Sequence, residues 1–187
     1  MFSLTGKVAL VTGASRGIGK AIATQLQALG ATVVGTATSD NGAEKISEYL
    51  GTGNGLVLNV TSDDSIAAMF SAIKEAHGGV DILVNNAGIT RDNLFMRMKD
   101  DEWQDIIDTN LTSIFKVSKA AIRPMMKKRN GRIINIGSVV GTSSYTWPGD
   151  ASNGGSSFGV AIKGEADPTS GPLEINVTNW HFFMGNL

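Results

Sequence analysis

The glycine-rich segment Gly13–Gly19 has residue types and spacing suited to binding phosphate. It follows an apolar run, Val8–Val11, and precedes a segment whose apolar residues have helical spacing. Glycine allows positive φ angles and close backbone approach, and a helix N-terminus offers free N–H groups and the positive end of its dipole. The spacing is G-x-x-x-G-x-G, which differs from the general dinucleotide fingerprint G-x-G-x-x-G. The segment predicts a diphosphate-binding turn; the alternative is a connector without a ligand.

The residues after the second apolar run indicate which dinucleotide such a turn would bind. An NAD site places a carboxylate at the end of the second strand, where it accepts from the ribose 2′-OH. Here Thr36 is followed by Ala37 and Thr38, so this carboxylate is absent. Asp40 comes just before a helical pattern, so we expect it to be an N-cap. Arg16 could pair with a 2′-phosphate, and the sequence therefore favours NADP(H).

Apolar runs alternate with helical patterns along most of the chain. The expected strands are Lys7–Thr12, Thr32–Thr36, Leu56–Val60, Asp81–Asn85 and Arg132–Ile136. The expected helices are Ile18–Leu29, Gly42–Leu50, Asp63–His77 and Glu102–Lys128, the last interrupted or kinked near Pro124. Because each parallel crossover needs a covering helix, this alternation predicts an α/β fold. We expect a Rossmann-type doubly wound parallel sheet in three layers, α/β/α.

The sequence changes character after Thr142. Residues 143–187 are rich in Ser and Gly and lack a helical period. Within them, Leu173–Thr178 alternates apolar and polar residues in a way that is typical of a strand. We therefore expect a dinucleotide-binding region at 1–142 and a divergent tail at 143–187. We expect the fold of this C-terminal portion to be truncated or irregular. The sequence leaves open whether the tail belongs to the same domain as residues 1–142.

Composition and charge exclude several classes of function. The 187 residues carry a formal net charge of −1, so no overall field favours nucleic acid or an anionic membrane. The chain contains no Cys, which excludes thiolate metal sites, and neither His has companion metal ligands. No apolar run is long enough to span a bilayer, and the N-terminus lacks an apolar signal core. We expect a cytoplasmic protein without a metal ion.

The chain contains the motifs Thr12-Gly13-x3-Gly17-x-Gly19 and Asn85-Asn86-Ala87-Gly88, then Asn110, and then Ser138 after the fifth expected strand. Together these residues resemble the short-chain dehydrogenase/reductase family. Longer strings resemble the bacterial 3-oxoacyl-[acyl-carrier-protein] reductases within that family: Gly35–Ser39, Asn86–Leu94 and Gly137–Thr142. The resemblance runs from Lys7 to Thr142, about three quarters of the chain.

The resemblance implies an oxidoreductase of fatty acid synthesis that uses NADPH to reduce a β-ketoacyl thioester to the 3-hydroxyacyl thioester. The implied cofactor contacts are Gly13, Gly17, Ile18 and Gly19 of the turn; Ser15, Arg16 and Thr38 at the adenosine phosphate end; Asn59 and Val60 at the adenine; and Asn86, Ala87 and Gly88 beneath the cofactor. Ser138 would hydrogen-bond the substrate carbonyl, and Asn110 would position a water of the proton relay.

The resemblance also implies partners. Lys127-Lys128-Arg129 resembles the basic patch that docks the acidic acyl carrier protein, with Lys128 and Arg129 as the expected contacts. The alternative is that these cations only complement the dipole at a helix C-terminus, and the two roles are compatible. Members of the family are usually tetramers. We therefore expect a homo-oligomer, in which the helix from Glu102 could pair with its copy.

The sequence departs from the family at the residues that transfer the proton. The family places a Tyr and, four residues later, a Lys after the fifth strand. Hydride transfer to a ketone forms an alkoxide that needs a proton, and a nearby ammonium lowers the Tyr pKa. Here Tyr145 is followed four residues later by Gly149, and no Tyr stands four residues before Lys163. The alternatives to an active reductase are a catalytically impaired NADP(H)-binding module and a chimeric or frameshifted chain.

Overall fold

The computed structural model describes residues 3–91, 97–137 and 165–166. Most of the tail expected at 143–187 lies outside these residues, and so does the strand pattern at Leu173–Thr178. The same is true of Ser138, Tyr145 and Lys163. The structure therefore tests the expectations for the glycine-rich turn, the sheet and the helices that cover it.

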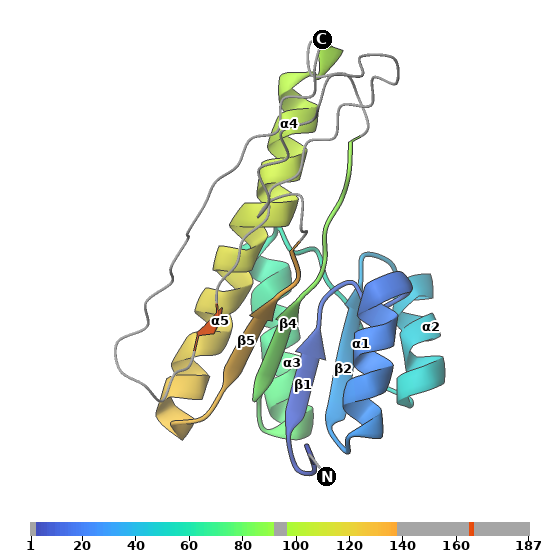
Figure 1. The fold of residues 1–187 in the computed structure, drawn as a ribbon, viewed down its shortest axis with the longest axis vertical. Coiled ribbons are helices and arrows are strands. Elements are labelled where there is room, and N and C mark those ends of the chain that lie inside the picture. Colours follow the sequence, from blue (N-terminus) through green and yellow to red (C-terminus); the bar gives the residue numbers. More distant parts are fainter. Residues whose placement is uncertain (1–2, 92–96, 138–164, 167–187) are drawn as a thin grey trace, which may run out of the picture.

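The sheet is built mainly of parallel strands. The strands are β1 (Val8–Val11), β2 (Thr32–Ala37), β3 (Gly55–Val57), β4 (Ile82–Asn85), β5 (Arg132–Asn135) and β6 (Glu165–Ala166). Their order is β3-β2-β1-β4-β5-β6, with β1 to β5 parallel and β6 antiparallel to β5 (Figure 1). The strand order reverses between β1 and β4, and ligands of open α/β sheets bind at the carboxyl side of such a switch point. The predicted doubly wound parallel sheet is confirmed.

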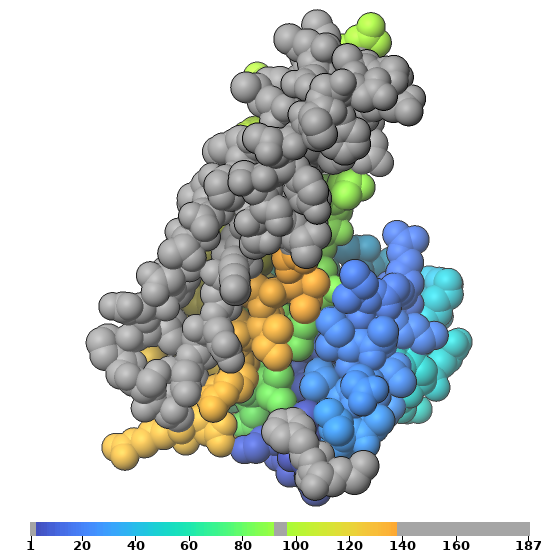
Figure 2. Space-filling model, viewed as in Figure 1, coloured from blue at the N-terminus to red at the C-terminus, as the bar shows by residue number. Residues whose placement is uncertain are grey.

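Helices cover both faces of the sheet because alternate strand residues point to opposite faces. The helices are α1 (Gly17–Ala28), α2 (Asp40–Leu50), α3 (Asp63–His77), α4 (Asp100–Ile107), the π-helical turn η2 (Asp108–Thr112) and α5 (Ser113–Lys128). Ala9 and Val11 of β1 pack with α1 and α2, whereas Val8 and Leu10 pack with α3 and α5. The segments of α1 and α2 lie next to each other on one side of the sheet (Figures 1 and 2). The three-layer α/β/α arrangement is thus confirmed.

The structure corrects two local predictions. The helix expected at Glu102–Lys128 is interrupted by the π-helical turn Asp108–Thr112, and α5 continues through the exposed Pro124. Asp40 is not an N-cap, because the preceding residue fills this position. The Ser39 hydroxyl accepts a hydrogen bond from the Gly42 N–H, and Asp40 lies in the first turn of α2.

No helix within the residues that the structure describes combines the length and the apolar character needed to cross a bilayer.

Candidate dinucleotide-binding site

The glycine-rich turn connects the carboxyl end of β1 to the N-terminus of α1, beside the switch point of the sheet. Two of its residues have left-handed backbone angles, Gly13 with a φ of 67° and Gly17 with a φ of 58°. The helix begins at Gly17, and its N-cap residue, Arg16, makes no capping hydrogen bond with its side chain. The first N–H groups of α1 are therefore not capped by that side chain, and they lie at the positive end of the helix dipole.

Gly19 allows the start of α1 to approach the turn closely. A Cβ atom at this position would collide with the carbonyl oxygen of Gly13 and with the side-chain amide of Asn86. The backbone angle of Gly19 is not what requires glycine here; the requirement is space. The last glycine of the motif is therefore needed for packing between helix and turn.

Thr12 and Asn86 join the ends of β1 and β4 beneath the turn. The Thr12 hydroxyl accepts from the N–H groups of Asn86 and Ala87 at 2.9 and 3.0 Å. The Asn86 side-chain amide donates to the carbonyl oxygens of Thr12 and Gly13 at 3.0 and 3.2 Å. These four hydrogen bonds fix the two strand ends that border the switch point. Asn86 was expected at the floor of the site, whereas Thr12 was expected only as part of the glycine-rich motif.

Ala14 of the turn is held from two other elements. Its N–H donates to the carbonyl oxygen of Thr36 on β2 at 2.9 Å, and its carbonyl oxygen accepts from the Tyr49 hydroxyl on α2 at 2.7 Å. Ala14 is fully buried. Burial also raises the pKa of the Tyr49 phenol, so that it stays a neutral donor. Tyr49 was not singled out from the sequence, although it follows Ile46 by three residues on the packed side of α2.

The side of the site next to β2 has the polar character expected for a phosphate. Ser15 is half-buried, and Arg16 and Thr38 are exposed. A Cβ at Gly42, in the first turn of α2, would lie 3.8 Å from the Cβ of Ser15, so this end of α2 approaches the turn. The residues that directly follow β2 are Thr38 and Ser39, neither of which carries a negative charge.

The loop after β3 contains Asn59 and Val60, which were expected at the adenine. The Asn59 side-chain oxygen accepts from the N–H and the hydroxyl of Thr61 at 3.0 and 2.8 Å. Val60 is buried in the cluster that α3 and α5 form against the sheet. The Lys116 ammonium of α5 donates to the carbonyl oxygen of Thr61 at 3.0 Å. Hydrogen bonds within the loop and from α5 thus fix its position. Lys116, which supplies the bond from α5, was not predicted from the sequence.

Asn110 lies in the π-helical turn η2 and is bound to the backbone of Ile89. Its side-chain oxygen accepts from the Ile89 N–H at 2.8 Å, and its side-chain amide donates to the Ile89 carbonyl oxygen at 2.9 Å. A Cβ at Gly88 would lie 3.3 Å from the Asn110 side-chain oxygen. Asn110 therefore connects η2 to the segment that follows β4. Ser138, the other expected catalytic residue, lies outside the described residues.

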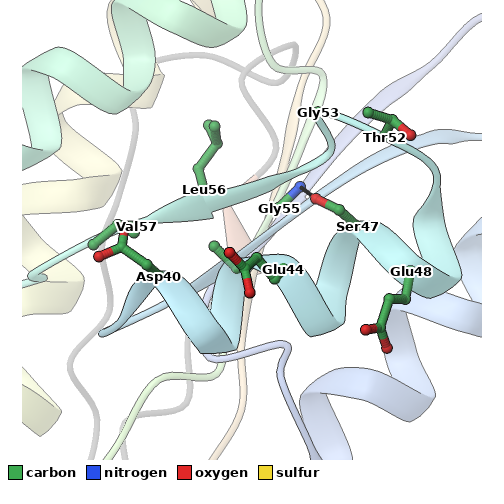
Figure 3. Close-up of a pocket in the computed structure, with 10 residues that line it drawn as sticks. Asp40, Glu44, Ser47, Glu48, Thr52, Gly53, Gly55, Leu56 and Val57 are labelled. Atoms are coloured by element: carbon green, nitrogen blue, oxygen red, sulfur yellow. Dashed lines mark hydrogen bonds between the residues drawn. The ribbon is translucent and has the colours of Figure 1, made fainter.

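A groove of about 680 Å³ lies at the other side of α2, against β3 (Figure 3). Asp40, Glu44 and Glu48 contribute carboxylates to its lining. Negative charges repel phosphate, so this groove does not suit a dinucleotide. Within the described ranges, no group of three or more His, Cys, Asp or Glu residues is arranged to hold a metal ion.

Comparisons with known proteins agree with this geometry. A family model described as short chain dehydrogenase matches residues 7–161. The chain is 68% identical over 141 residues to a 3-oxoacyl-[acyl-carrier-protein] reductase of Vibrio cholerae, covering 75% of this chain and 58% of the relative. It is 69% identical over 138 residues to the Escherichia coli protein of that name, covering 73% and 57%. The chain thus spans less than two thirds of the length of these relatives. On the family match and these identities, the chain belongs to the short-chain dehydrogenase family.

Proposed function

We propose that the chain binds NADP(H) at the switch point and carries the cofactor-binding part of a 3-oxoacyl-[acyl-carrier-protein] reductase. The observation that carries this proposal is the turn Gly13–Gly19, whose shape leaves the N-terminus of α1 open to an anion. The identity of 68% to a reductase of that name supports the reaction class. That reaction is the reduction of a β-ketoacyl thioester to the 3-hydroxyacyl thioester.

Membership of the family implies a nicotinamide dinucleotide, which supplies a hydride when bound. The turn fits the diphosphate of this cofactor because there is open space beside Gly17, where a Cβ would meet no atom within 4 Å. Gly19, in contrast, packs against the turn and faces no such space. We assign the phosphate contacts to Gly13, Gly17, Ile18 and Gly19. The 2′-phosphate would lie by Ser15, Arg16 and Thr38, where Arg16 supplies the charge that favours NADP(H). Asn59 and Val60 would flank the adenine, and Asn86, Ala87 and Gly88 would form the floor.

The proposed reaction also needs residues that polarise the substrate and supply a proton. We assign the substrate carbonyl to Ser138. Because Asn110 uses its side chain to bind Ile89, we assign any contact with a water to its backbone carbonyl or a remaining lone pair. The Tyr and Lys of the family are absent at their usual spacing. Loss of a general acid lowers rates by about 10²–10⁴. This observation favours a second candidate function, an NADP(H)-binding module with little turnover.

The basic segment at the end of α5 is the proposed docking site for acyl carrier protein. Lys128 lies 3.2 Å from the carboxylate of Asp81, which offsets part of its charge. Arg129 and Lys127 are exposed. We therefore assign the main docking contact to Arg129 and a weaker contact to Lys128. Titration with acyl carrier protein should show weaker binding by Arg129→Ala than by Lys128→Ala.

A homo-oligomer, a tetramer in most of the family, is the proposed state of assembly. Phe115 and Met126 of α5 are each 58% exposed, and such apolar side chains favour a contact between copies. Light scattering that gives the mass of a monomer at micromolar concentration would contradict this part of the proposal.

Calorimetric titration of the full chain with NADPH and NADH tests the proposed function. We expect NADPH to bind more tightly than NADH, and Arg16→Ala to weaken NADPH binding about tenfold while leaving NADH binding unchanged. Arg123→Ala is the matched control, since Arg123 is exposed on α5. An assay with a β-ketoacyl thioester of acyl carrier protein then separates the two candidates, because the binding module gives little turnover. Failure of both dinucleotides to bind would contradict the proposal.

A further inference from the structure

The peptide between Ala14 and Ser15 is hydrogen-bonded to Tyr49 of α2. The Ala14 carbonyl oxygen accepts from the Tyr49 hydroxyl at 2.7 Å. The residue is fully buried, so this carbonyl has little access to water. A buried carbonyl without a donor is unfavourable, and the phenol is the side chain that satisfies it.

The same contact determines the direction of the next N–H group. A trans peptide is planar, and its C=O and N–H point in opposite directions. No cis peptide occurs among the described residues. When Tyr49 holds the Ala14 carbonyl towards α2, the Ser15 N–H must point away from Tyr49. None of the backbone hydrogen bonds of the described residues uses this N–H as a donor.

We propose that Tyr49 is a positioning residue for the cofactor: its hydroxyl fixes the Ala14–Ser15 peptide so that the Ser15 N–H is directed at a phosphate of the dinucleotide. The inference rests on the proposed NADP(H) binding at this turn. A turn whose N–H groups are already oriented loses less conformational freedom when the ligand binds. Tyr49 thereby acts through the backbone and does not itself touch the cofactor.

Other contacts hold the Tyr49 ring and α2 in the position that this role requires. The Lys20 ammonium of α1 lies 4.9 Å from the centroid of the Tyr49 ring. The Gln27 side chain of α1 donates to the carbonyl oxygen of Leu50 at 3.1 Å. Both contacts join α1 to α2 next to Tyr49. Helix α2 is therefore a support for the turn as well as a cover for the sheet.

The test compares Tyr49→Phe with Ser47→Ala. Tyr49→Phe removes the hydroxyl but keeps the ring that contacts Lys20. Ser47 lies on the same helix, and its hydroxyl accepts from the Gly55 N–H of β3 at 3.1 Å (Figure 3). Ser47→Ala therefore removes a hydrogen bond between a hydroxyl and the backbone that does not involve the turn. It is a matched control for a general loss of stability.

Two measurements on the full chain test whether Tyr49 positions the turn for the cofactor. In calorimetric titration, Tyr49→Phe should raise the Kd for NADPH about tenfold, and Ser47→Ala should leave it within about twofold of the original chain. In hydrogen exchange without cofactor, Tyr49→Phe should speed exchange of the Ala14 amide, which donates to the Thr36 carbonyl oxygen, whereas Ser47→Ala should speed exchange at Gly55.

Each outcome bears on a different claim. An unchanged Kd in Tyr49→Phe, or an equal rise in both variants, would overturn the positioning role. Unchanged exchange at Ala14 in Tyr49→Phe would overturn it as well. If the original chain binds no dinucleotide, the proposed function fails and the cofactor role fails with it. The exchange data would then still show whether Tyr49 orders the turn.

Discussion

Thr12 shows how one buried hydroxyl joins two strands at the site. The Thr12 hydroxyl accepts from two backbone N–H groups that follow β4, and the whole residue is only 2% exposed. Replacing it with valine keeps the shape but leaves both N–H groups without that acceptor. We expect Thr12→Val to lower the free energy of unfolding by about 2 kcal/mol, measured by urea denaturation. Thr12→Ser, which retains the hydroxyl, should cost less. Equal stability of the valine variant and the original chain would contradict this role.

Tyr49 gives a prediction for alkaline pH. Burial raises the pKa of its phenol above the ordinary value of about 10, and the Lys20 ammonium faces its ring. A group whose pKa is raised in the folded state contributes stability below its unfolded pKa and loses it as pH rises through the folded pKa. The stability advantage of the original chain over Tyr49→Phe should therefore shrink as the pH rises above about 10, the ordinary pKa of a tyrosine. A constant difference in urea denaturation across this range would contradict the shift.

At the residue scale, the conformation of the glycine-rich turn could be predicted from the sequence, whereas the residues that act through tertiary contacts could not. The turn Gly13–Gly19 could be predicted because its spacing and its place after a strand restrict the backbone. The role of Tyr49 could not, because its partner Ala14 lies 35 positions away and becomes a neighbour only when α2 packs. Thr12 is similar, since its partners follow β4.

At the element scale, the π-helical turn η2 shows how a side chain supports a break in a helix. Asn110 makes two hydrogen bonds to Ile89, outside its own helix. We expect Asn110→Ala to lower the free energy of unfolding by about 2 kcal/mol. Gln104→Ala is the control, because the side-chain amide of the exposed Gln104 donates to the half-buried Asp108 one turn away, and its loss should cost under about 0.5 kcal/mol. Chemical denaturation measures both, and equal costs would contradict the role of Asn110.

The elements themselves were largely predictable from the sequence, but some of their ends were not. The helix Asp63–His77 matches its predicted bounds, because Ser62 caps its start and Gly78 ends it in a left-handed conformation. The break at η2 was placed near Pro124 instead, because proline is the residue that signals a kink. The interrupting contact comes from Ile89, and no spacing within the helix reveals it. The N-cap of α2 was assigned to Asp40 instead of Ser39 because both are common N-cap residues and they stand next to each other in the sequence.

At the scale of the whole molecule, the site follows from the order of the strands. The chain moves outward from β1 to β2 and β3, and then returns to place β4 on the other side of β1. This reversal brings the turn after β1 beside the segment after β4 (Figure 1). There the Asn86 side chain donates to the carbonyl oxygens of Thr12 and Gly13. The alternation of strands and helices was sufficient to predict this arrangement. The boundary predicted at Thr142 stays a prediction, although the family match continues to residue 161.

Calorimetric titration of the original chain and Gly19→Ala with NADPH tests most directly whether the turn is the cofactor site. A methyl group at Gly19 collides with Gly13 and Asn86. One at the remote Gly53 meets no atom within 4 Å, and because Gly53 has a φ of 83°, Gly53→Ala is a control for backbone strain away from the turn. We expect the original chain and Gly53→Ala to bind NADPH, and Gly19→Ala to lose at least about tenfold in affinity. Equal binding by Gly19→Ala and the original chain, or no binding of NADPH by the original chain, would contradict the account.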